Sequence, residues 1–174
     1  MSVTLRPASP ADARAVAEVH TEGWNTTYPG VLPAPLIAGR TVENRTGRWT
    51  GYLADPPGIL IVAEEPDGRV AGFVNIQPPR NPADGDYDCE ISHLYLREDR
   101  QRQGLGRKLM RAAAEAAVRR GWRSAVVRAF KGNPSAGFYP RLGGRRLGER
   151  AIGMDGLTVF ETVYGWDDFP AAMG

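Results

Sequence analysis

The sequence predicts an α/β (α+β) fold, with one sheet in a single layer and helices on both of its faces. Runs of β-branched and aromatic residues, typical of strands, alternate along the chain with segments whose apolar residues recur at helical spacing. The chain has 174 residues, of which 42% are hydrophobic and 24% charged, and this suits one domain with its own core. We see no internal repeat and no long linker. We therefore expect a single domain over residues 1–174.

Charge, cysteine content and hydropathy argue against several classes of protein. The net charge of +2 is too small to indicate general nucleic-acid or membrane binding. A single cysteine, Cys89, cannot form an intrachain disulfide, so a cytoplasmic location is expected. The N-terminal residues hold no apolar run of signal-peptide length, and no run reaches the roughly 20 residues of a transmembrane helix. Two histidines and one cysteine are too few for a zinc site of the usual composition, so we expect no metal.

The first part of the chain is expected to be helical after one short strand, Val3–Leu5. Ser9 and Pro10 suit the N-cap and the first position of a helix, which apolar residues continue as far as His20. A break rich in proline and glycine follows. A second helix is expected over Val42–Leu53, and prolines end it.

The middle of the chain is expected to form strands. Ile59–Glu64 and Val70–Ile76 are apolar runs, and Asp67-Gly68 between them is a hairpin turn signal. A polar loop over residues 78–88 leads to Glu90–Leu96. That run contains β-branched and aromatic residues, and it predicts a central strand.

The helix that follows is the most regular of the chain. Leu105, Leu109, Ala112 and Ala116 lie at i, i+4, i+7 and i+11, which predicts one buried stripe ending before Gly121. The remaining expected elements are a strand over Ser124–Phe130, a short helix over Asn133–Arg141, an optional strand near Arg145–Gly148 and a strand over Leu157–Tyr164.

A glycine-rich turn over residues 101–106 lies between a strand and this helix. A helix start leaves backbone N–H groups unpaired and carries the positive end of the dipole. Gly104 and Gly106 let the backbone approach a bulky anion. Positive charge is added by Arg102, Arg107 and Lys108. The turn therefore suits a phosphate or pyrophosphate; the alternative is a tight turn at a solvated basic helix start.

Two well-known phosphate-binding motifs do not fit this turn. The P-loop, GxxxxGK[ST], requires lysine and then a hydroxyl residue after its last glycine, but Gly106 is followed by Arg107. The dinucleotide fingerprint GxGxxG requires a third glycine, and Leu109 occupies that position. The turn therefore belongs to neither the P-loop nor the dinucleotide-binding class.

Two motifs together resemble those of the GNAT superfamily of N-acetyltransferases. Gln101, Gly104 and Gly106 fill the pattern [QR]xxGx[GA], which is similar to the acetyl-CoA-binding motif of that family. The later run Asn133-Pro134-Ser135-Ala136-Gly137-Phe138-Tyr139, followed by Leu142-Gly143, looks like its second signature. The order of elements is also similar over nearly the whole chain. The resemblance implies a mixed, mostly antiparallel sheet whose fourth and fifth strands splay apart.

The resemblance also implies a binding site for acetyl-CoA as the acyl donor. The pantetheine arm would lie between the splayed strands and pair with the main chain of Leu94 and Leu96. The amides of residues 103–108 would hold the pyrophosphate, and Asn133 would reach the pantetheine, cap the following helix, or do both. The implied donor-binding residues are Leu94, Tyr95, Leu96, Arg102, Gln103, Gly104, Leu105, Gly106, Arg107, Lys108, Asn133, Ala136 and Tyr139.

Tyr139 matches the usual general acid of the family. A phenol within hydrogen-bond reach can protonate the coenzyme A sulfur as it leaves. The alternative is a core aromatic whose hydroxyl is bonded elsewhere. A backbone N–H near Leu94 would stabilise the oxyanion.

Glu90, at the start of the expected central strand, lies where some family members carry a catalytic glutamate. In a partly apolar cleft the pKa of a carboxyl group rises, which suits a general base acting directly or through water. Glu90 could instead bind the amine or pair with an arginine. Strand alternation predicts that Glu90, Ser92, Leu94 and Leu96 share one face and that His93 lies on the other.

The acceptor site is expected near the loop after the first helix, which walls this site in the family. Trp24 and Tyr28 in that loop could stack on or enclose a ligand; Trp24 could instead only anchor the helix. The loop over residues 84–88 is acidic and could attract a cationic amine, or it is simply a solvated loop. Family members often dimerise through the last strand, so a homodimer is one expectation.

These observations give one leading hypothesis and several alternatives. The leading hypothesis is an acetyl-CoA-dependent N-acetyltransferase that acts on a small-molecule primary amine by direct attack. A variant with the same chemistry acetylates a protein N-terminus or lysine. A second class is a non-catalytic acyl-CoA sensor, and a third binds nucleic acid through residues 100–120. The retention of Glu90 and Tyr139 speaks against the sensor, and the near-neutral charge speaks against nucleic acid.

Overall fold

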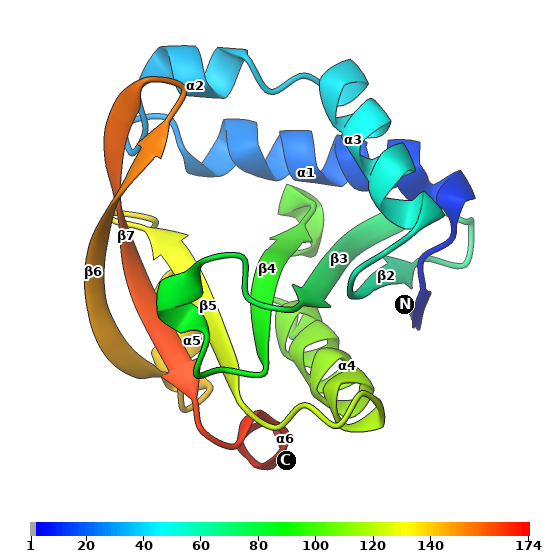
Figure 1. Ribbon diagram of the computed structural model, residues 1–174. Helices are drawn as coiled ribbons and strands as arrows, with labels where there is room; N and C mark the ends of the chain where they lie inside the picture. The colour runs from blue at the N-terminus through cyan, green and yellow to red at the C-terminus, as the bar shows by residue number, and fades with distance from the viewer. Residues whose placement is uncertain (1–2) are drawn as a thin grey trace.

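The computed structural model describes residues 3–174, and it contains one sheet of seven strands in the order β1-β2-β3-β4-β5-β7-β6 (Figure 1). Every neighbouring pair is antiparallel except β4 and β5, so the predicted mixed, mostly antiparallel sheet is confirmed. The strands are β1 (Thr4–Pro7), β2 (Ile59–Glu64), β3 (Val70–Gln77), β4 (Cys89–Leu96), β5 (Ala125–Phe130), β6 (Arg145–Met154) and β7 (Leu157–Trp166).

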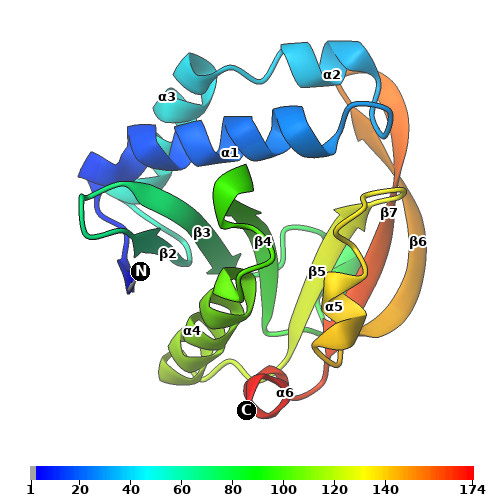
Figure 2. The same cartoon turned by 180° about the vertical axis from the view of Figure 1, so that it is seen from behind.

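Helices cover both faces of the sheet, as predicted (Figures 1 and 2). α1 and α3 pack on one face of the sheet, with α2 between them in the chain, and α4 packs on the other. The helices are α1 (Ala13–Thr27), α2 (Ala34–Ala38), α3 (Val42–Ala54), α4 (Leu105–Arg119), α5 (Phe138–Arg141) and α6 (Phe169–Met173). None of the helices within residues 3–174 is both long and apolar enough to cross a bilayer.

The alternation of side chains along β3 divides the core into two layers. Phe73 packs with Trp49 and the apolar side of α1. Its neighbour Val74 points the other way, toward Leu109 and Met110 of α4. All of these side chains are buried, so both faces of the central strands are held by hydrophobic burial.

The parallel pair β4–β5 is short, because the two strands pair only over Cys89–Ile91 and Ala125–Val127. Beyond these residues the strands diverge, and β4 ends close to the start of α4 (Figure 1). The predicted splay of the fourth and fifth strands is therefore confirmed. It leaves one edge of β4 without a strand partner in the middle of the sheet.

A β-bulge interrupts β4. Asn75 of β3 pairs with His93, whereas the next residue, Ile76, pairs with Ile91. Ser92 is thus an extra residue in β4. A bulge of this kind changes which face the following side chains point to.

The bulge makes the predicted side-chain alternation wrong. Leu94 and Leu96 pack into the layer under α4, while Glu90 contacts groups on the opposite face. Ser92 and His93 both border a cavity on that opposite face. His93 therefore lies on the same side as Glu90, because the extra residue shifts the period of two by one position.

Four further elements differ from the expectation. The helix predicted over residues 133–141 is reduced to α5, because Asn133 and the residues after it form turns in which its Oδ1 accepts from the Ser135 amide at 2.8 Å. The optional strand is a full strand, β6, since it pairs with β7 along its length. α2 and α6 were not predicted, because five residues carry little helical periodicity.

Candidate active site

The glycine turn before α4 has the conformation that close backbone approach requires. Gly104 has φ +81°, in the left-handed region that favours glycine, and Arg102 also has a positive φ, of 59°. Gly104 is the N-cap of α4, and its carbonyl accepts the Lys108 amide at 3.2 Å. The amides of the first helical turn have no acceptor within the helix. They and the helix dipole form an anion-binding surface.

Gly106 is needed for close packing, not for a backbone conformation that only glycine adopts easily. A Cβ at this position would lie 3.3 Å from Cζ of Phe138, which is tighter than ordinary contact. The second glycine of the motif therefore lets α4 approach the start of α5. This contact links the two sequence motifs in space.

The open edge of β4 continues from this turn. Residues 92–96 of β4 have no partner on the side of β5, so their outward N–H and C=O groups on that edge are available to an extended ligand. Tyr139, on α5, packs against the layer under α4, with its ring 5.9 Å from Tyr164 and 5.6 Å from Phe138. Burial raises the pKa of the Tyr139 phenol, so the phenol stays protonated near neutral pH and can donate a proton.

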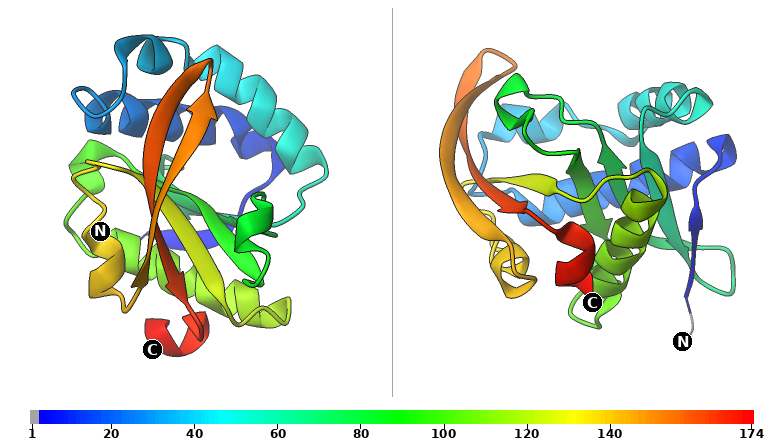
Figure 3. Two further views of the ribbon diagram at one scale, coloured as in Figure 1. Left: turned by 60° about the vertical axis from the view of Figure 1, so that its left-hand side comes forward. Right: turned by 60° about the horizontal axis from the view of Figure 1, so that its bottom comes forward.

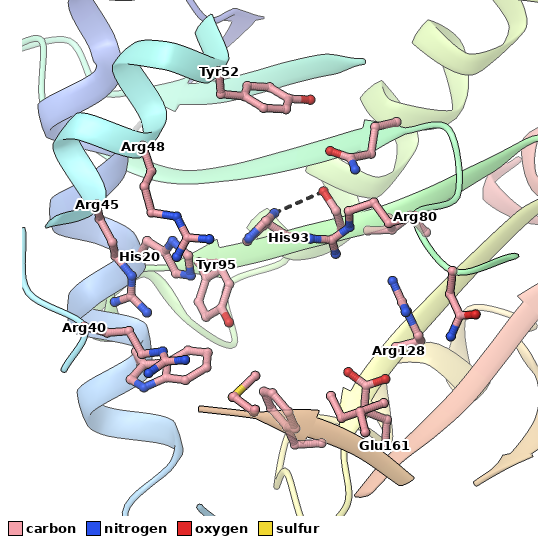
Figure 4. A pocket seen from close by; sticks show the side chains of 18 of the residues that line it. His20, Arg40, Arg45, Arg48, Tyr52, Arg80, His93, Tyr95, Arg128 and Glu161 are labelled. Carbon is pink, nitrogen blue, oxygen red and sulfur yellow. Dashed lines mark hydrogen bonds between the residues drawn. The ribbon is translucent and has the colours of Figure 1, made fainter. Parts of the chain in front are cut away.

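A cavity of about 850 Å³ lies on the opposite face, against α1, α3 and the splayed ends of β4 and β5 (Figure 4). Trp24 and Tyr28, predicted to contact an acceptor, both line it. Trp24 is also packed into an aromatic cluster, with its ring 4.6 Å from that of Tyr28, as in the alternative in which it anchors the helix; its contact with an acceptor stays a prediction. The β6–β7 hairpin closes one side, since its residues pack against α2 and the end of α1 (Figure 3).

The lining of this cavity is basic, with five arginines: Arg40, Arg45, Arg48, Arg80 and Arg128. Arg45 is only 4% exposed, donates to Thr21 Oγ1 at 3.2 Å and lies 5.0 Å above the Trp24 ring. Burial lowers the pKa of Arg45 to about 10, so it keeps its charge near neutral pH. No carboxylate within residues 3–174 forms an ion pair with Arg45 or Arg48. Buried charges are normally paired, so this end of the cavity suits an anion.

Glu90 is not part of the cavity lining. It is 1% exposed, and Oε2 accepts from Arg128 Nη2 at 2.6 Å and from the Arg80 amide at 3.3 Å. Oε1 accepts from the Arg80 guanidinium and from Gln77 Nε2. Both oxygens are thus occupied, as in the alternative of an arginine partner. Glu90 orients two of the arginines that do line the cavity.

The loop over residues 84–88 is not a free acidic surface. Asp84 is 1% exposed and pairs with Arg150, and its Oδ2 lies 3.8 Å from Arg128 Nε. Asp88 Oδ2 accepts the amides of Arg123 and Ser124. These two carboxylates stabilise the fold, whereas Asp86 of the same loop is exposed.

A buried histidine, His20, and a half-buried one, His93, form a neutral wall of the cavity. The rings of His20 and His93 are 5.0 Å apart, and burial lowers the pKa of His93 to about 3 and that of His20 well below its usual range. His20 Nδ1 accepts from Trp49 Nε1 at 3.3 Å. Neither histidine carries charge near neutral pH, so the charge of the cavity comes from the arginines and one carboxylate.

Sequence analysis missed the residues that set this charge. Arg45, Trp49 and Leu53 are all buried and are spaced four residues apart on α3. An arginine on the apolar stripe of a helix is a detectable signal of a buried charge. Glu161 of β7 also lines the cavity, but nothing in its local sequence distinguishes it from other strand carboxylates.

The fold and site together define a class of protein: a sheet parted between two parallel strands, with a basic helix start at one end and a cavity on the opposite face. A model of the acetyltransferase (GNAT) family matches residues 22–144. An uncharacterised N-acetyltransferase of Bacillus subtilis, YuaI, is 33% identical over 97% of this chain and 95% of its own. The chain belongs to this acetyltransferase family.

Two further relatives have named acceptors. An L-methionine sulfoximine/L-methionine sulfone acetyltransferase of Pseudomonas aeruginosa is 28% identical over 82% of this chain and 80% of its own. The crystal structure of a phosphinothricin acetyltransferase from Sinorhizobium meliloti, in complex with acetyl-CoA, has a TM-score of 0.68 and 20% identity over 95% of this chain and 88% of its own. The second likeness is one of fold.

The ion pairs of Glu90 predict that this residue contributes to the stability of the fold. Replacing Glu90 by alanine removes the close partner of Arg128, whose side chain is 14% exposed, and leaves a buried charge uncompensated. We expect Glu90→Ala to lower the free energy of unfolding by about 3–5 kcal/mol. Urea denaturation measures this change. Glu149→Ala, which removes a more exposed carboxylate, is the control and should cost less than about 1 kcal/mol; equal effects of the two variants would contradict the assignment.

Proposed function

We propose that this chain transfers the acetyl group of acetyl-CoA to the primary amine of a small molecule that also carries an anionic group. One observation carries the proposal. The arginine-lined cavity is bordered by β4 and β5 where they diverge, so an acceptor inside it would face a donor lying in the opening. The acetyl group and the amine would meet there.

The donor half of the site fits acetyl-CoA. The first-turn amides of α4, the left-handed Gly104 and the basic side chains of Arg102, Arg107 and Lys108 suit the pyrophosphate. The open edge of β4 over residues 92–96 suits the amides of the pantetheine arm, as an added strand would. Asn133 uses Oδ1 for a turn, which leaves its Nδ2 as a donor toward the same arm. Bound acetyl-CoA supplies the thioester whose acyl group is transferred.

Tyr139 is the proton donor to the departing sulfur in this proposal. Its phenol is half-buried and protonated, and it lies on α5, beside the glycine turn that would hold the donor. A main-chain N–H of β4 near Leu94 would stabilise the negative charge that develops on the thioester oxygen. The pair Glu90–Arg128 holds the wall of the acceptor cavity in place.

The cavity favours a small acceptor with an anionic group over a protein chain. Arg45 and Arg48 are charged groups without carboxylate partners among residues 3–174, and an acceptor anion would supply one. The β6–β7 hairpin packs against α2 and the end of α1 and so covers one side of the cavity, which leaves less room for a peptide chain. The acceptors named for two relatives, methionine sulfoximine or sulfone and phosphinothricin, are small amino acids of this kind.

Binding of the donor is tested by thermal unfolding with acetyl-CoA. At about 100 times its dissociation constant a ligand adds roughly 2.7 kcal/mol of stability, so we expect the midpoint to rise by roughly 5–10 °C. Gly104→Val should abolish the rise, because a side chain at the turn blocks the anion site. Gly121→Val is a matched control, since Gly121 has a similar φ of +75° at the other end of α4 and open space around it. A full rise in Gly104→Val would contradict the donor site.

The preference of the enzyme among acceptors tests whether its acceptor carries an anionic group. We expect small amino acids to release thiol from acetyl-CoA with a higher kcat/KM than polyamines or peptides. Removal of a hydrogen bond to a charged group costs about 1.5–3 kcal/mol, so Arg45→Gln should lower kcat/KM for these amino acids by roughly 10- to 150-fold. The thermal shift with acetyl-CoA should be unchanged. Arg119→Gln, at the exposed end of α4, is the control. Preference for polyamines, or no effect of Arg45→Gln, would refute this acceptor class.

A further inference from the structure

Glu161 is the one acidic side chain among the cavity-lining residues that the structure describes. It belongs to β7, opposite Phe130 of β5, and its carboxylate points into the cavity (Figure 4). Its Oε2 is buried, and no hydrogen-bond donor of residues 3–174 reaches it. Native proteins seldom leave a buried carboxylate oxygen without a partner, so this atom requires an explanation.

The arginines nearby do not supply that partner. Arg128 and Arg80 lie near enough to Glu161 to lower its pKa, but neither bonds to its Oε2, and both are already bonded to Glu90. Burial raises the pKa of Glu161, and the negative charges of Asp84 and Glu90 add to this effect, while Arg128 and Arg80 oppose it. A carboxylate in this environment gains most from a positively charged ligand.

The position of Glu161 complements the basic end of the cavity. Arg40, Arg45 and Arg48 lie on one side, and Glu161 lies on the opposite side (Figure 4). An acceptor with its anionic group on Arg45 would present its ammonium group toward Glu161. The cavity thus carries groups of opposite charge on its two sides, as a zwitterionic acceptor would require.

We propose that Glu161 binds the ammonium group of the acceptor and accepts the proton that the amine loses before attack. This assignment rests on the function proposed above and adds the residue that prepares the nucleophile. Glu90, the other carboxylate near the splayed strands, has both oxygens bonded to arginine or glutamine and is free neither to bind nor to accept. His93 is held by Ser92 Oγ at 3.0 Å, and its low pKa makes it a poor proton acceptor.

The protons and electrons balance in this scheme. Glu161 takes one proton from the ammonium group, and the freed lone pair forms the new C–N bond to the acetyl carbon. The C–S bond breaks, and its electron pair leaves with sulfur. Tyr139 protonates that sulfur and recovers its proton from the nitrogen, which loses its second proton as the amide forms. Glu161 then releases its proton to solvent.

Steady-state kinetics of Glu161→Gln test the assignment. We expect kcat/KM for an amino-acid acceptor to fall by about 10²- to 10⁴-fold, the range for loss of general acid–base catalysis, while the acetyl-CoA thermal shift is kept. The fall should be much smaller for an aminooxy acid, whose NH₂ group is already unprotonated at neutral pH. Glu149→Gln, on the neighbouring β6 and outside the cavity lining, is the matched control and should behave as wild type.

Failure of the Glu161 assignment and failure of the proposed function give different experimental results. An active wild-type enzyme with unchanged kinetics in Glu161→Gln would overturn the assignment and leave the proposed function standing. The same fall for the amino acid and the aminooxy acid would also overturn it, because a merely structural role does not depend on the protonation of the acceptor. If wild-type protein acetylates no amine, the proposed function fails and the assignment fails with it.

Discussion

The early end of the β4–β5 pairing is the constraint on which the rest of the site depends. Three residues on each strand pair, and then the strands part, although a continuous sheet would satisfy more backbone groups. The open edge of β4 is costly unless a ligand pairs with it. Packing on both faces holds the opening in place, because α4 fixes β4 from one side and α1 and α3 fix it from the other.

The two faces of this opening have different chemistry. On the α4 side, a glycine turn and a helix start present N–H groups and positive charge to an anion. On the other side, aromatic rings and arginines enclose a cavity. The bulge at Ser92 serves this division, since it turns Ser92 and His93 toward the cavity and Leu94 and Leu96 toward α4. One extra residue thus directs neighbouring side chains of β4 to two different sides of the sheet.

Local sequence signals predicted the elements on the α4 side of the opening well and the lining of the cavity poorly. The turn at Gly104 and the run ending at Tyr139 are short, contiguous motifs. The family that they resemble implied the splayed sheet. The bulge has no sequence signal, so alternation placed His93 on the wrong face. The acceptor cavity is assembled from α3, the β3–β4 loop, β5 and β7, and only the fold brings Arg45, Arg128 and Glu161 together. Whether each of these side chains has an ion-pair partner is decided by the tertiary structure, not by the local sequence.

Hydrogen–deuterium exchange with and without saturating acetyl-CoA tests the central claim most directly. If the donor occupies the opening, the amides of residues 92–96 in β4 and of residues 103–107 at the start of α4 should become protected. The amides that hydrogen-bond β6 to β7 are already paired, so their exchange rates should not change. Protection confined to other segments, or none in β4, would contradict the account of the parted sheet as the donor site.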